Sequence, residues 1–268
     1  MQELMKMNFS RLSKNHHKWI RRLHQKKYRQ EEKAFIAEGL NSLQSAMEMT
    51  HHPIKEVIVD QDYVELIRET PSLYRISDDI PIYTCSKKEM ESISTEETPQ
   101  GIIIICSETE FSFDELEKNP SKNLLYLERV SNPGNLGTIL RTAAWFGMKQ
   151  ILLSPFSVDL FNTKVIRASA GAIFGMEIYQ SVDFDRLSRF AKRKNYKLTA
   201  AVPEGGTPIN QWKKTRKNII LLGHEAKGLS KEVIEQADRH ISIPPQGNVE
   251  SLNLAIAAAI ILYEIAGR

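Results

Sequence analysis

The second half of the chain alternates short apolar strands with helices, and this pattern limits the folds open to it. The expected strands are NLLYLERV, QILLS, MEIYQ, KLTAAV, NIILLG and HISIP, and the helices between and after them are NLGTILRTAAWFG, TKVIRASAGAIF, DFDRLSRFAKRK, SKEVIEQA and a final apolar run. Fully apolar strands separated by helices predict an α/β fold with a parallel sheet covered on both faces. Ligands of such sheets bind beyond the carboxyl ends of the strands, so chemistry is expected in the loops there.

The first half predicts a smaller α/β unit. A helix is expected over residues 34–49, and KEVIVD, PIYTCS and GIIIICS are expected to be strands with the helices YVELIRE and KKEMESIS between them. The acidic, proline-bearing stretch over 108–121 is typical of a linker. We therefore expect an N-terminal domain over 1–107, a linker over 108–121 and a C-terminal domain over 122–268.

Composition excludes several classes of protein. The apolar run Leu252–Tyr263 is shorter than the roughly 18 residues that cross a bilayer, and no charged-then-apolar signal follows Met1. We therefore expect a soluble cytoplasmic protein with no membrane partner. Cys85 and Cys106 are the only cysteines. Their spacing supports neither a disulfide scaffold nor a zinc ribbon, and two buried thiols are expected instead.

Positive charge is concentrated near the start of the chain. Residues 11–33 contain nine Lys or Arg against two Glu, a local balance of +7 within a net charge of +3. Trp19, Tyr28 and three histidines lie among these cations, a mixture that suits phosphate contact and base stacking. A solvated helix face is the plainer interpretation of such a run. Contact with nucleic acid and a solvated helix face are both open interpretations of this segment at this point.

The loop after the first strand of the C-terminal domain is SNPGNLGTILRTAAWFG. Leu136, Ile139, Leu140 and Ala143 recur at helical spacing and are expected to be buried, which places Arg141 on another face. A cation close to a helix start is disfavoured by the helix dipole, so its presence hints at a function. An ordinary solvent-exposed Arg is the alternative.

The loop GHEAKGLS follows the strand NIILL. Lys227 precedes Gly228 where a P-loop needs Ser or Thr, which argues against nucleoside triphosphate binding. No GxGxxG follows any strand, which argues against a nicotinamide oxidoreductase. Gly223 and Gly228 permit a tight backbone around Glu225. The alternative role for Glu225 is to stabilise the dipole of the helix that follows it.

The third loop, IPPQGNVESLN, joins the last strand to the terminal helix. Ser251 and Asn253 stand where a helix cap is common, so capping explains one of them. Proline and glycine fix the path of the loop and leave its backbone groups free to bind a ligand.

Together the three loops resemble the three motifs of the SpoU family, within the SPOUT class of S-adenosylmethionine-dependent RNA methyltransferases. The matching residues are Asn135, Gly137 and Arg141 in the first motif, Gly223, Glu225 and Gly228 in the second, and Ile243, Pro244, Ser251, Leu252 and Asn253 in the third. Arg167, Ser169 and Gly171 match the family's spacer. FIAEG and TPQGIIII resemble, more weakly, the N-terminal RNA-binding domain of ribosomal-RNA members.

The resemblance implies a deep C-terminal trefoil knot, a homodimer and methyl transfer from S-adenosylmethionine to a ribose 2′-hydroxyl, in 23S rRNA rather than tRNA, with no metal ion. It implies that the cofactor binds around Gly223, Ile243 and Leu252, with Ala200 and Ala201 as weaker candidates. The implied catalytic residues are Arg141, Asn135, Glu225, Ser251 and Asn253.

The role of Arg141 stays open between base and phosphate anchor. Removing a proton from a guanidinium inside a protein is costly, so we favour a group that binds RNA phosphate and polarises the 2′-oxygen. Two alternative functions also stay open: a tRNA 2′-O-methyltransferase and a non-catalytic rRNA-binding assembly factor. The sequence names neither the modified nucleotide nor a housekeeping or antibiotic-resistance role.

Overall fold

The structure is a computed structural model that describes residues 9–49, 51–69, 79–213, 215–248 and 251–266. The chain divides into two compact units. The first comprises Met1–Thr109 and Phe161–Gly175, and the second comprises Glu110–Leu160 and Met176–Arg268. Residues 161–175, expected within the C-terminal domain, thus group with the first unit.

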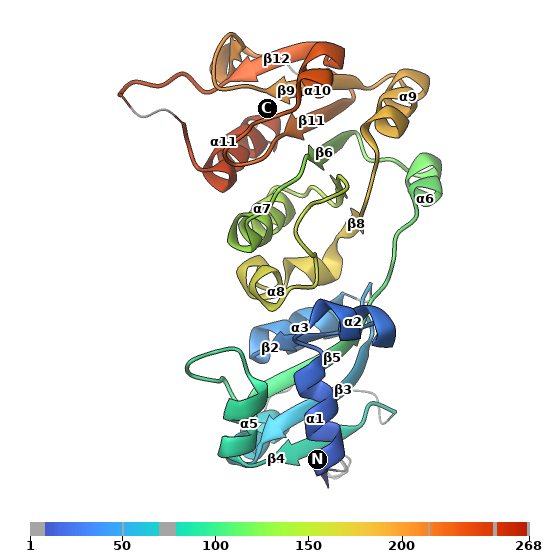
Figure 1. Ribbon diagram of the computed structural model, residues 1–268, viewed down its shortest axis with the longest axis vertical. Helices are drawn as coiled ribbons and strands as arrows, with labels where there is room; N and C mark the ends of the chain where they lie inside the picture. Colours follow the sequence, from blue (N-terminus) through green and yellow to red (C-terminus); the bar gives the residue numbers. More distant parts are fainter. Residues whose placement is uncertain (1–8, 50, 70–78, 214, 249–250, 267–268) are drawn as a thin grey trace. The chain divides into compact units, whose positions relative to one another are not determined.

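A seven-stranded sheet forms the centre of the second unit (Figure 1). Its strands lie in the order β10-β12-β9-β11-β6-β7-β8, and every neighbouring pair is parallel. Their bounds are β6 Asn123–Leu127, β7 Gln150–Leu153, β8 Glu177–Tyr179, β9 Lys197–Ala201, β10 Thr207–Pro208, β11 Asn218–Leu222 and β12 Arg239–Ser242. The predicted parallel sheet is confirmed, and β10 is a short edge strand that the sequence pattern did not predict.

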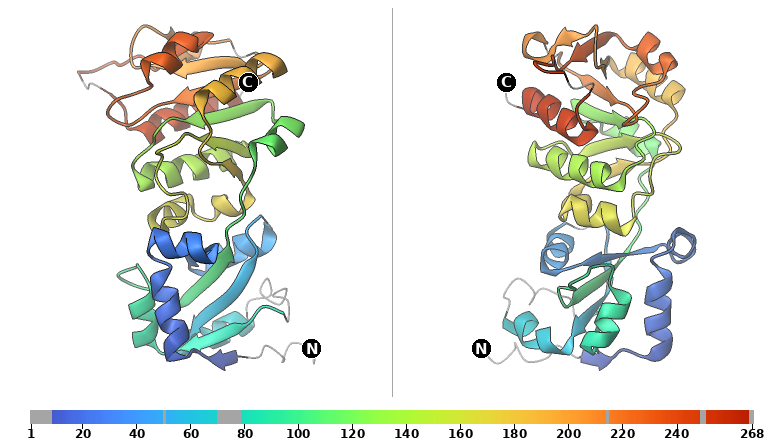
Figure 2. Two further views of the ribbon diagram at one scale, coloured as in Figure 1. Left: turned by 45° about the vertical axis from the view of Figure 1, so that its right-hand side comes forward. Right: turned by 60° about the vertical axis from the view of Figure 1, so that its left-hand side comes forward.

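Helices cover both faces of this sheet. On one face α7 (Pro133–Trp145) packs against α11 (Leu254–Ala266), and the two lie side by side in all views (Figures 1 and 2). The other face carries α6 (Phe113–Lys118), α9 (Phe184–Lys194) and α10 (Lys231–Gln236), whose apolar side chains share a core with the strands. A 3₁₀ turn, η5, spans Ile209–Gln211.

Local sequence explains where these helices begin. Asn132 caps α7 by accepting the Asn135 N–H at 3.1 Å, and Pro133 occupies the first turn, where its missing N–H costs nothing. The predicted stripe on α7 is confirmed, since Leu136, Ile139, Leu140 and Ala143 are all fully buried. Their burial fixes the side of α7 that faces the sheet and leaves Arg141 exposed.

The stretch expected to be a linker contains α6. Ser112 and Glu115 form a capping box at its start, and Phe113 and Leu116 are buried in the core of the second unit. The acidic composition of this stretch therefore reflects an amphipathic helix with an exposed outer side. The functional division into three parts stays a prediction.

The first unit contains a mixed five-stranded sheet in the order β1-β4-β3-β5-β2. Strands β1, β4 and β3 are parallel, whereas β5 runs antiparallel to both of its neighbours. The strands are β1 Phe9–Arg11, β2 Ala34–Glu38, β3 Ile54–Asp60, β4 Ile82–Cys85 and β5 Ile102–Ser107. The helices are α1 Lys14–Arg22, α2 Lys26–Glu32, α3 Leu40–Glu48, α4 Val64–Glu69 after the 3₁₀ turn η2 Gln61–Tyr63, and α5 Lys87–Ile93.

Residues 161–175 complete the first unit with α8 (Thr163–Ser169) and the 3₁₀ turn η4 (Ala172–Gly175). Phe161 stacks on Phe35 of β2 with ring centroids 4.7 Å apart. Arg167 forms an ion pair with Glu96 at 2.8 Å. Gly171 packs so closely on α3 that a Cβ there would lie 2.8 Å from the Cβ of Ser45.

Two predicted helices are wrong in part. The helix expected over 34–49 begins only at Leu40, because Ala34–Glu38 is strand β2 with four consecutive buried residues. A short run of apolar residues does not distinguish a buried strand from a helix. The helix expected over TKVIRASAGAIF ends at Ser169, because Ala170 and Gly171 both take positive φ, +47° and +88°.

The two cysteines and the hydropathy of the helices were also considered in the sequence. Cys85 and Cys106 are both free and buried, as predicted. Within the residues that the structure describes, none of the helices has the length and hydropathy needed to cross a membrane.

The close packing of Gly171 on α3 predicts a specific cost for a methyl group. Gly171→Ala adds a strained φ, worth about 1–2 kcal/mol, and overpacking against Ser45, worth about 1–3 kcal/mol. Gly147→Ala is the matched control, since Gly147 has φ +74° but no atom within 4 Å of the added Cβ. We expect the free energy of unfolding, measured in urea, to fall clearly further for Gly171→Ala. Equal losses would contradict this packing.

Candidate functional site

The loops singled out in the sequence meet at one edge of the parallel sheet. Strands β11 and β6 are hydrogen-bonded neighbours, with Leu222 beside Leu127, so the loops that follow them leave the sheet together. The loop after β6 leads into α7, and α11 packs on α7. Segments separated by about a hundred residues in sequence are therefore neighbours at the carboxyl ends of the strands.

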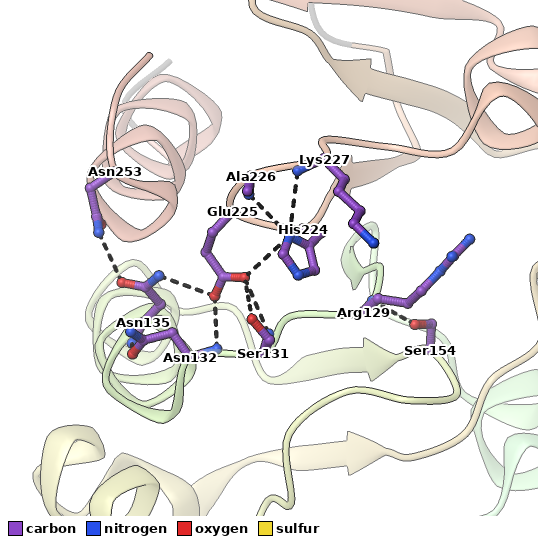
Figure 3. A network of polar contacts seen from close by, with 10 residues as sticks. All are labelled: Arg129, Ser131, Asn132, Asn135, Ser154, His224, Glu225, Ala226, Lys227 and Asn253. Atoms are coloured by element: carbon purple, nitrogen blue, oxygen red, sulfur yellow. Dashed lines mark hydrogen bonds and ion pairs between the residues drawn. The ribbon is translucent and has the colours of Figure 1, made fainter. Parts of the chain in front are cut away.

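Glu225 joins the loop after β11 to the start of α7 (Figure 3). Its carboxylate accepts hydrogen bonds from the Ser131 N–H at 3.2 Å, the Ser131 Oγ at 3.0 Å, the Asn132 N–H at 2.9 Å and the Asn135 Nδ2 at 3.1 Å. The negative charge thus lies at the positive end of the α7 dipole. The alternative considered from sequence, that Glu225 serves the helix following it, names the wrong helix.

Asn135 connects this carboxylate to the third loop. Its Nδ2 donates to Glu225, while its Oδ1 accepts a hydrogen bond from Asn253 Nδ2 at 3.0 Å. Asn253 also caps α11, because its Oδ1 accepts the Ala255 N–H at 2.8 Å. Asn253 therefore combines the capping role with a link to Asn135. We call Ser131, Asn132, Asn135, Glu225 and Asn253 the Glu225 network.

The network has an electrostatic signature. Partial burial would by itself raise the pKa of Glu225, but the hydrogen bonds donated by Asn132, Asn135 and Ser131 outweigh that effect and lower the pKa to about 2. A carboxylate that accepts several N–H bonds is strongly stabilised in its charged form. Glu225 is consequently ionised at neutral pH and holds its donors in fixed directions.

The backbone around Glu225 is folded back on itself. His224 and Gly228 exchange two backbone hydrogen bonds of 3.0 and 2.8 Å, and Gly228 has φ +65°. A Cβ on Gly223 would lie 2.1 Å from the carbonyl carbon of Gly228, so only glycine allows this approach. His224 Nδ1 accepts the Ala226 N–H at 3.0 Å and closes the turn.

The residues predicted to bind a cofactor occupy neighbouring strand ends. Ala200 and Ala201 end β9, Gly223 follows β11 and Ile243 follows β12, and these three strands are adjacent in the order β12-β9-β11. Ala200 is fully buried, whereas Leu252, directly before Asn253, is 48% exposed. Their roles remain predictions, although the ends of these three strands do lie side by side.

Arg141 and Ser251 lie outside the network. Both are exposed, and the side chain of neither forms a hydrogen bond or an ion pair with another described residue. Arg141 lies on α7 six residues beyond Asn135, slightly less than two helical turns, or about 9 Å along the axis. Among the described residues, no cluster of His, Cys, Asp or Glu has the make-up of a metal site, so the expectation of no metal stays a prediction.

Sequence reasoning missed three members of this region: Ser131, Asn132 and His224. Asn132 carried a readable signal, because Asn followed by Pro is a common start of a helix. Ser131 carried none, since it donates through a backbone N–H, which almost any residue has, and through a single hydroxyl. The contact between His224 and its own loop follows from the turn geometry, which the sequence alone does not specify.

The low pKa of Glu225 predicts a pH-dependent stability. A folded pKa near 2, against the ordinary value of 4.5, stabilises the fold above pH 4.5 and loses that contribution as pH falls towards 2. We expect Glu225→Gln to lower the free energy of unfolding at neutral pH, with a difference from the wild type that shrinks over this window. Glu204→Gln, at an exposed site before β10, is the control for replacing a glutamate by glutamine outside the network. A Glu225→Gln difference that did not change with pH would contradict the assignment.

Two family models match the chain. Residues 122–263 match the SpoU rRNA Methylase family, and residues 14–104 match the MRM3-like substrate binding domain. The first match covers more than half of the chain and includes all members of the Glu225 network. The second covers most of the first unit.

Similar proteins agree with these matches. The 23S rRNA (guanosine(2553)-2′-O)-methyltransferase RlmP of Bacillus subtilis is 27% identical, over 92% of this chain and 94% of its own. An uncharacterized tRNA/rRNA methyltransferase of Synechocystis is 30% identical over 92% of this chain and 89% of its own. The crystal structure of an AdoMet-bound rRNA methyltransferase from Sinorhizobium meliloti superposes with a TM-score of 0.83 at 28% identity, covering 96% of both chains. The chain belongs to the SpoU rRNA methylase family.

Proposed function

We propose that this chain transfers the methyl group of S-adenosylmethionine to a ribose 2′-hydroxyl of 23S rRNA. The observation that carries the proposal is the Glu225 network, in which Asn253, Asn135 and Glu225 tie the three motif loops together by hydrogen bonds of 3.0 and 3.1 Å. The relative RlmP, similar over nearly its whole length, is named for 2′-O-methylation of a 23S rRNA guanosine. The S. meliloti neighbour is named for its bound AdoMet.

The adjacent ends of β12, β9 and β11 suit an adenosyl cofactor. Ala201 and Gly223 carry no side chain beyond Cβ, which leaves space for backbone N–H and C=O groups of these loops to meet an adenine edge. Ile243 and Leu252 supply apolar surface for the ring. S-adenosylmethionine contributes an electrophilic methyl group, and we assign the protein the task of holding it in line with the ribose oxygen.

Arg141 is the residue that we assign to the RNA. Its exposed guanidinium has a fixed positive charge and a donor geometry that matches a phosphate. Placed near the 2′-oxygen, it would bind the adjacent phosphate and stabilise the negative charge that develops as the hydroxyl loses its proton. Ser251, at the entrance to α11, and the Glu225 network would orient the substrate. The proton leaves to water or to another group.

We also propose that the segment from β12 to α11 passes through a loop of the chain as a trefoil knot. The support is that α11 packs on α7 while the strand before it, β12, lies two strands beyond β11. Threading of this kind is rare among known folds. Pulling the chain at both ends in an optical trap would measure a shorter extended length for a knotted chain.

A homodimer is proposed from the exposed face of α7 and α11. Trp145 is 85% exposed, Tyr263 62% and Ile256 51%, a concentration of apolar surface that monomeric proteins seldom leave in water. Phe146 packs edge-on against Tyr263 and joins the two helices in one surface. Sedimentation equilibrium of the full chain, with Ile256→Glu as the comparison, measures whether a second copy covers it.

The first unit is proposed to select the RNA target. Its α1 presents a basic outer side of Lys14, Lys18, Arg21 and Arg22, all exposed, while Ile20 is buried against the sheet. His17 and His24 bind α5 through Ser92 Oγ at 2.6 Å and Ile93 O at 2.7 Å, which fixes the helix with its cations outward. Such a surface attracts RNA phosphates regardless of sequence. A cytoplasmic location accords with an rRNA substrate and is part of this proposal.

The basic side of α1 predicts a change in salt dependence. The triple variant replaces Lys14, Lys18 and Arg21 by Gln. Its binding constant K for RNA should fall less steeply with salt, so that the magnitude of the slope of log K against log salt decreases by about 2, roughly 0.7 for each phosphate that a cation no longer neutralises. The measurement is 23S rRNA binding by the full chain at several salt concentrations. The control replaces Lys118, Lys149 and Lys192, three exposed lysines at the amino-terminal edge of the parallel sheet, and should leave the slope unchanged. Equal slopes for both triple variants would contradict an RNA surface on α1.

Two alternative functions can be distinguished from the proposed one by experiment. A tRNA 2′-O-methyltransferase would methylate tRNA in preference to 23S rRNA, but the relative RlmP, similar over 94% of its own length, is named for 23S rRNA. A non-catalytic assembly factor would not bind S-adenosylmethionine, which isothermal titration calorimetry detects directly. The modified nucleotide is found by mapping 2′-O-methyl positions in rRNA from cells with and without this protein.

The central test concerns Arg141 and Asn135. We expect Arg141→Ala to lower kcat/KM for 23S rRNA about a hundredfold, because a group that stabilises developing charge is removed, while S-adenosylmethionine affinity is unchanged. Asn135→Ala should also lower kcat/KM, because two loops lose their shared hydrogen-bond partner. Arg189→Ala, an exposed Arg on α9, is the control. Transfer of radiolabelled methyl groups to unmodified 23S rRNA is the assay, and full activity in both variants would refute the mechanism.

A further inference from the structure

Phe156 is an exposed aromatic side chain held in an unfavourable backbone conformation. The residue is 91% exposed and its φ is +66°. Pro155 and Phe156 occupy the corner of a turn closed by the Ser157 N–H to the Ser154 carbonyl at 3.4 Å. A turn with Pro first and positive φ second ordinarily takes Gly or Asn at that second position. An aromatic residue here is disfavoured by the positive φ and by the exposure of its ring to water, which calls for a compensating role.

The turn is fixed firmly beside the first motif. Ser154 is buried, and its Oγ accepts the Arg129 N–H at 2.7 Å (Figure 3). On the other side of the turn, the Val158 N–H donates to the Val130 carbonyl at 2.7 Å. Phe156 is thus held between two hydrogen bonds to residues 129–130, and the next residue, Ser131, belongs to the Glu225 network. The ring is exposed but its backbone is anchored.

Sheet order places Phe156 on the side away from the proposed cofactor loops. Across the carboxyl edge, the strands run β12, β9, β11, β6 and β7. The proposed cofactor residues follow the first three, the Glu225 network joins β11 to β6, and Phe156 follows β7. With the methyl donor on one side of the network, RNA that reaches it from the other side crosses the end of β7.

The positive charge of Arg129, whose backbone is bonded to the same turn, favours RNA as the occupant. Arg129 also has positive φ, +53°, and its side chain is 53% exposed, with one Nη2 contact to Glu128 at 3.1 Å. Glu128 itself is buried and accepts the Ser230 N–H at 2.7 Å, so it anchors Arg129 from beneath. An exposed flat ring on a turn that is bonded to the backbone of an Arg with an exposed side chain suits an unpaired base and its phosphate, because bases stack on aromatic rings whatever their sequence.

We propose that Phe156 is a stacking platform for an unpaired nucleotide next to the ribose that is methylated, with Arg129 contacting the backbone of the same nucleotide. The proposal rests on the proposed rRNA methyltransferase function. Phe156 is a positioning residue: it fixes where the RNA strand enters and takes no part in proton or methyl transfer.

The turn offers a variant that removes the ring without threatening the fold. Phe156→Gly relieves the positive φ, so its melting temperature should equal or exceed that of the wild type. Phe156→Leu keeps an apolar side chain and the same backbone constraint but has no flat surface. The assay is steady-state methylation of unmodified 23S rRNA by the full chain, together with calorimetric binding of S-adenosylmethionine.

We expect both variants to raise KM for 23S rRNA about tenfold, the size of one base stack, with kcat and S-adenosylmethionine affinity near the wild-type values. Wild-type protein irradiated with 5-bromouridine-substituted 23S rRNA should crosslink through the peptide that carries Phe156. A KM within twofold of wild type for Phe156→Gly would overturn the platform, and a wild-type KM for Phe156→Leu alone would overturn stacking. Failure of the wild-type chain to methylate 23S rRNA would instead overturn the function on which the proposal rests.

Discussion

The site depends on the hydrogen bonds that the ionised carboxylate of Glu225 accepts. It accepts hydrogen bonds from two consecutive backbone N–H groups and from the Asn135 side chain, and so fixes the loop after β11 to the start of α7. Asn135 then uses the other end of its amide to hold the entrance of α11. Because one amide donates to one loop and accepts from another, its orientation is fixed by both, and none of the three loops can shift alone.

The strand order of the parallel sheet places different kinds of residue on the two sides of this network. Along its carboxyl edge, Ala201 follows β9 and Gly223 follows β11, on one side of the network. The cation Arg129 follows β6, and the aromatic residue Phe156 follows β7 on the other side. Small residues suit close approach of a rigid ligand to backbone, whereas charge and flat rings suit a flexible polyanion. The order of strands, rather than any single side chain, therefore separates the proposed donor side from the proposed acceptor side.

Much of this fold is readable from sequence, and the exceptions have physical causes. The helical spacing of Leu136 to Ala143 fixed the buried side of α7, and family resemblance identified Asn135, Glu225 and Asn253. Their mutual contacts were beyond sequence reasoning, because a motif names residue types but not which helix a carboxylate caps. Ala34–Glu38 was misassigned because four consecutive buried residues have no period. Phe156 was missed because a Pro-Phe corner lacks the Gly or Asn that marks positive φ.

The long sequence separation within the Glu225 network has a consequence for how the protein is made. Asn135 and Asn253 are 118 positions apart. At a translation rate of about 5–20 residues per second, the ribosome needs roughly 6–24 seconds to add the later residue after the earlier one. During that interval the nascent chain has its first motif but not the partner of the Asn135 carbonyl. Under the proposed mechanism, the polypeptide does not act on RNA, including that of the ribosome producing it, until α11 has been synthesised and docked.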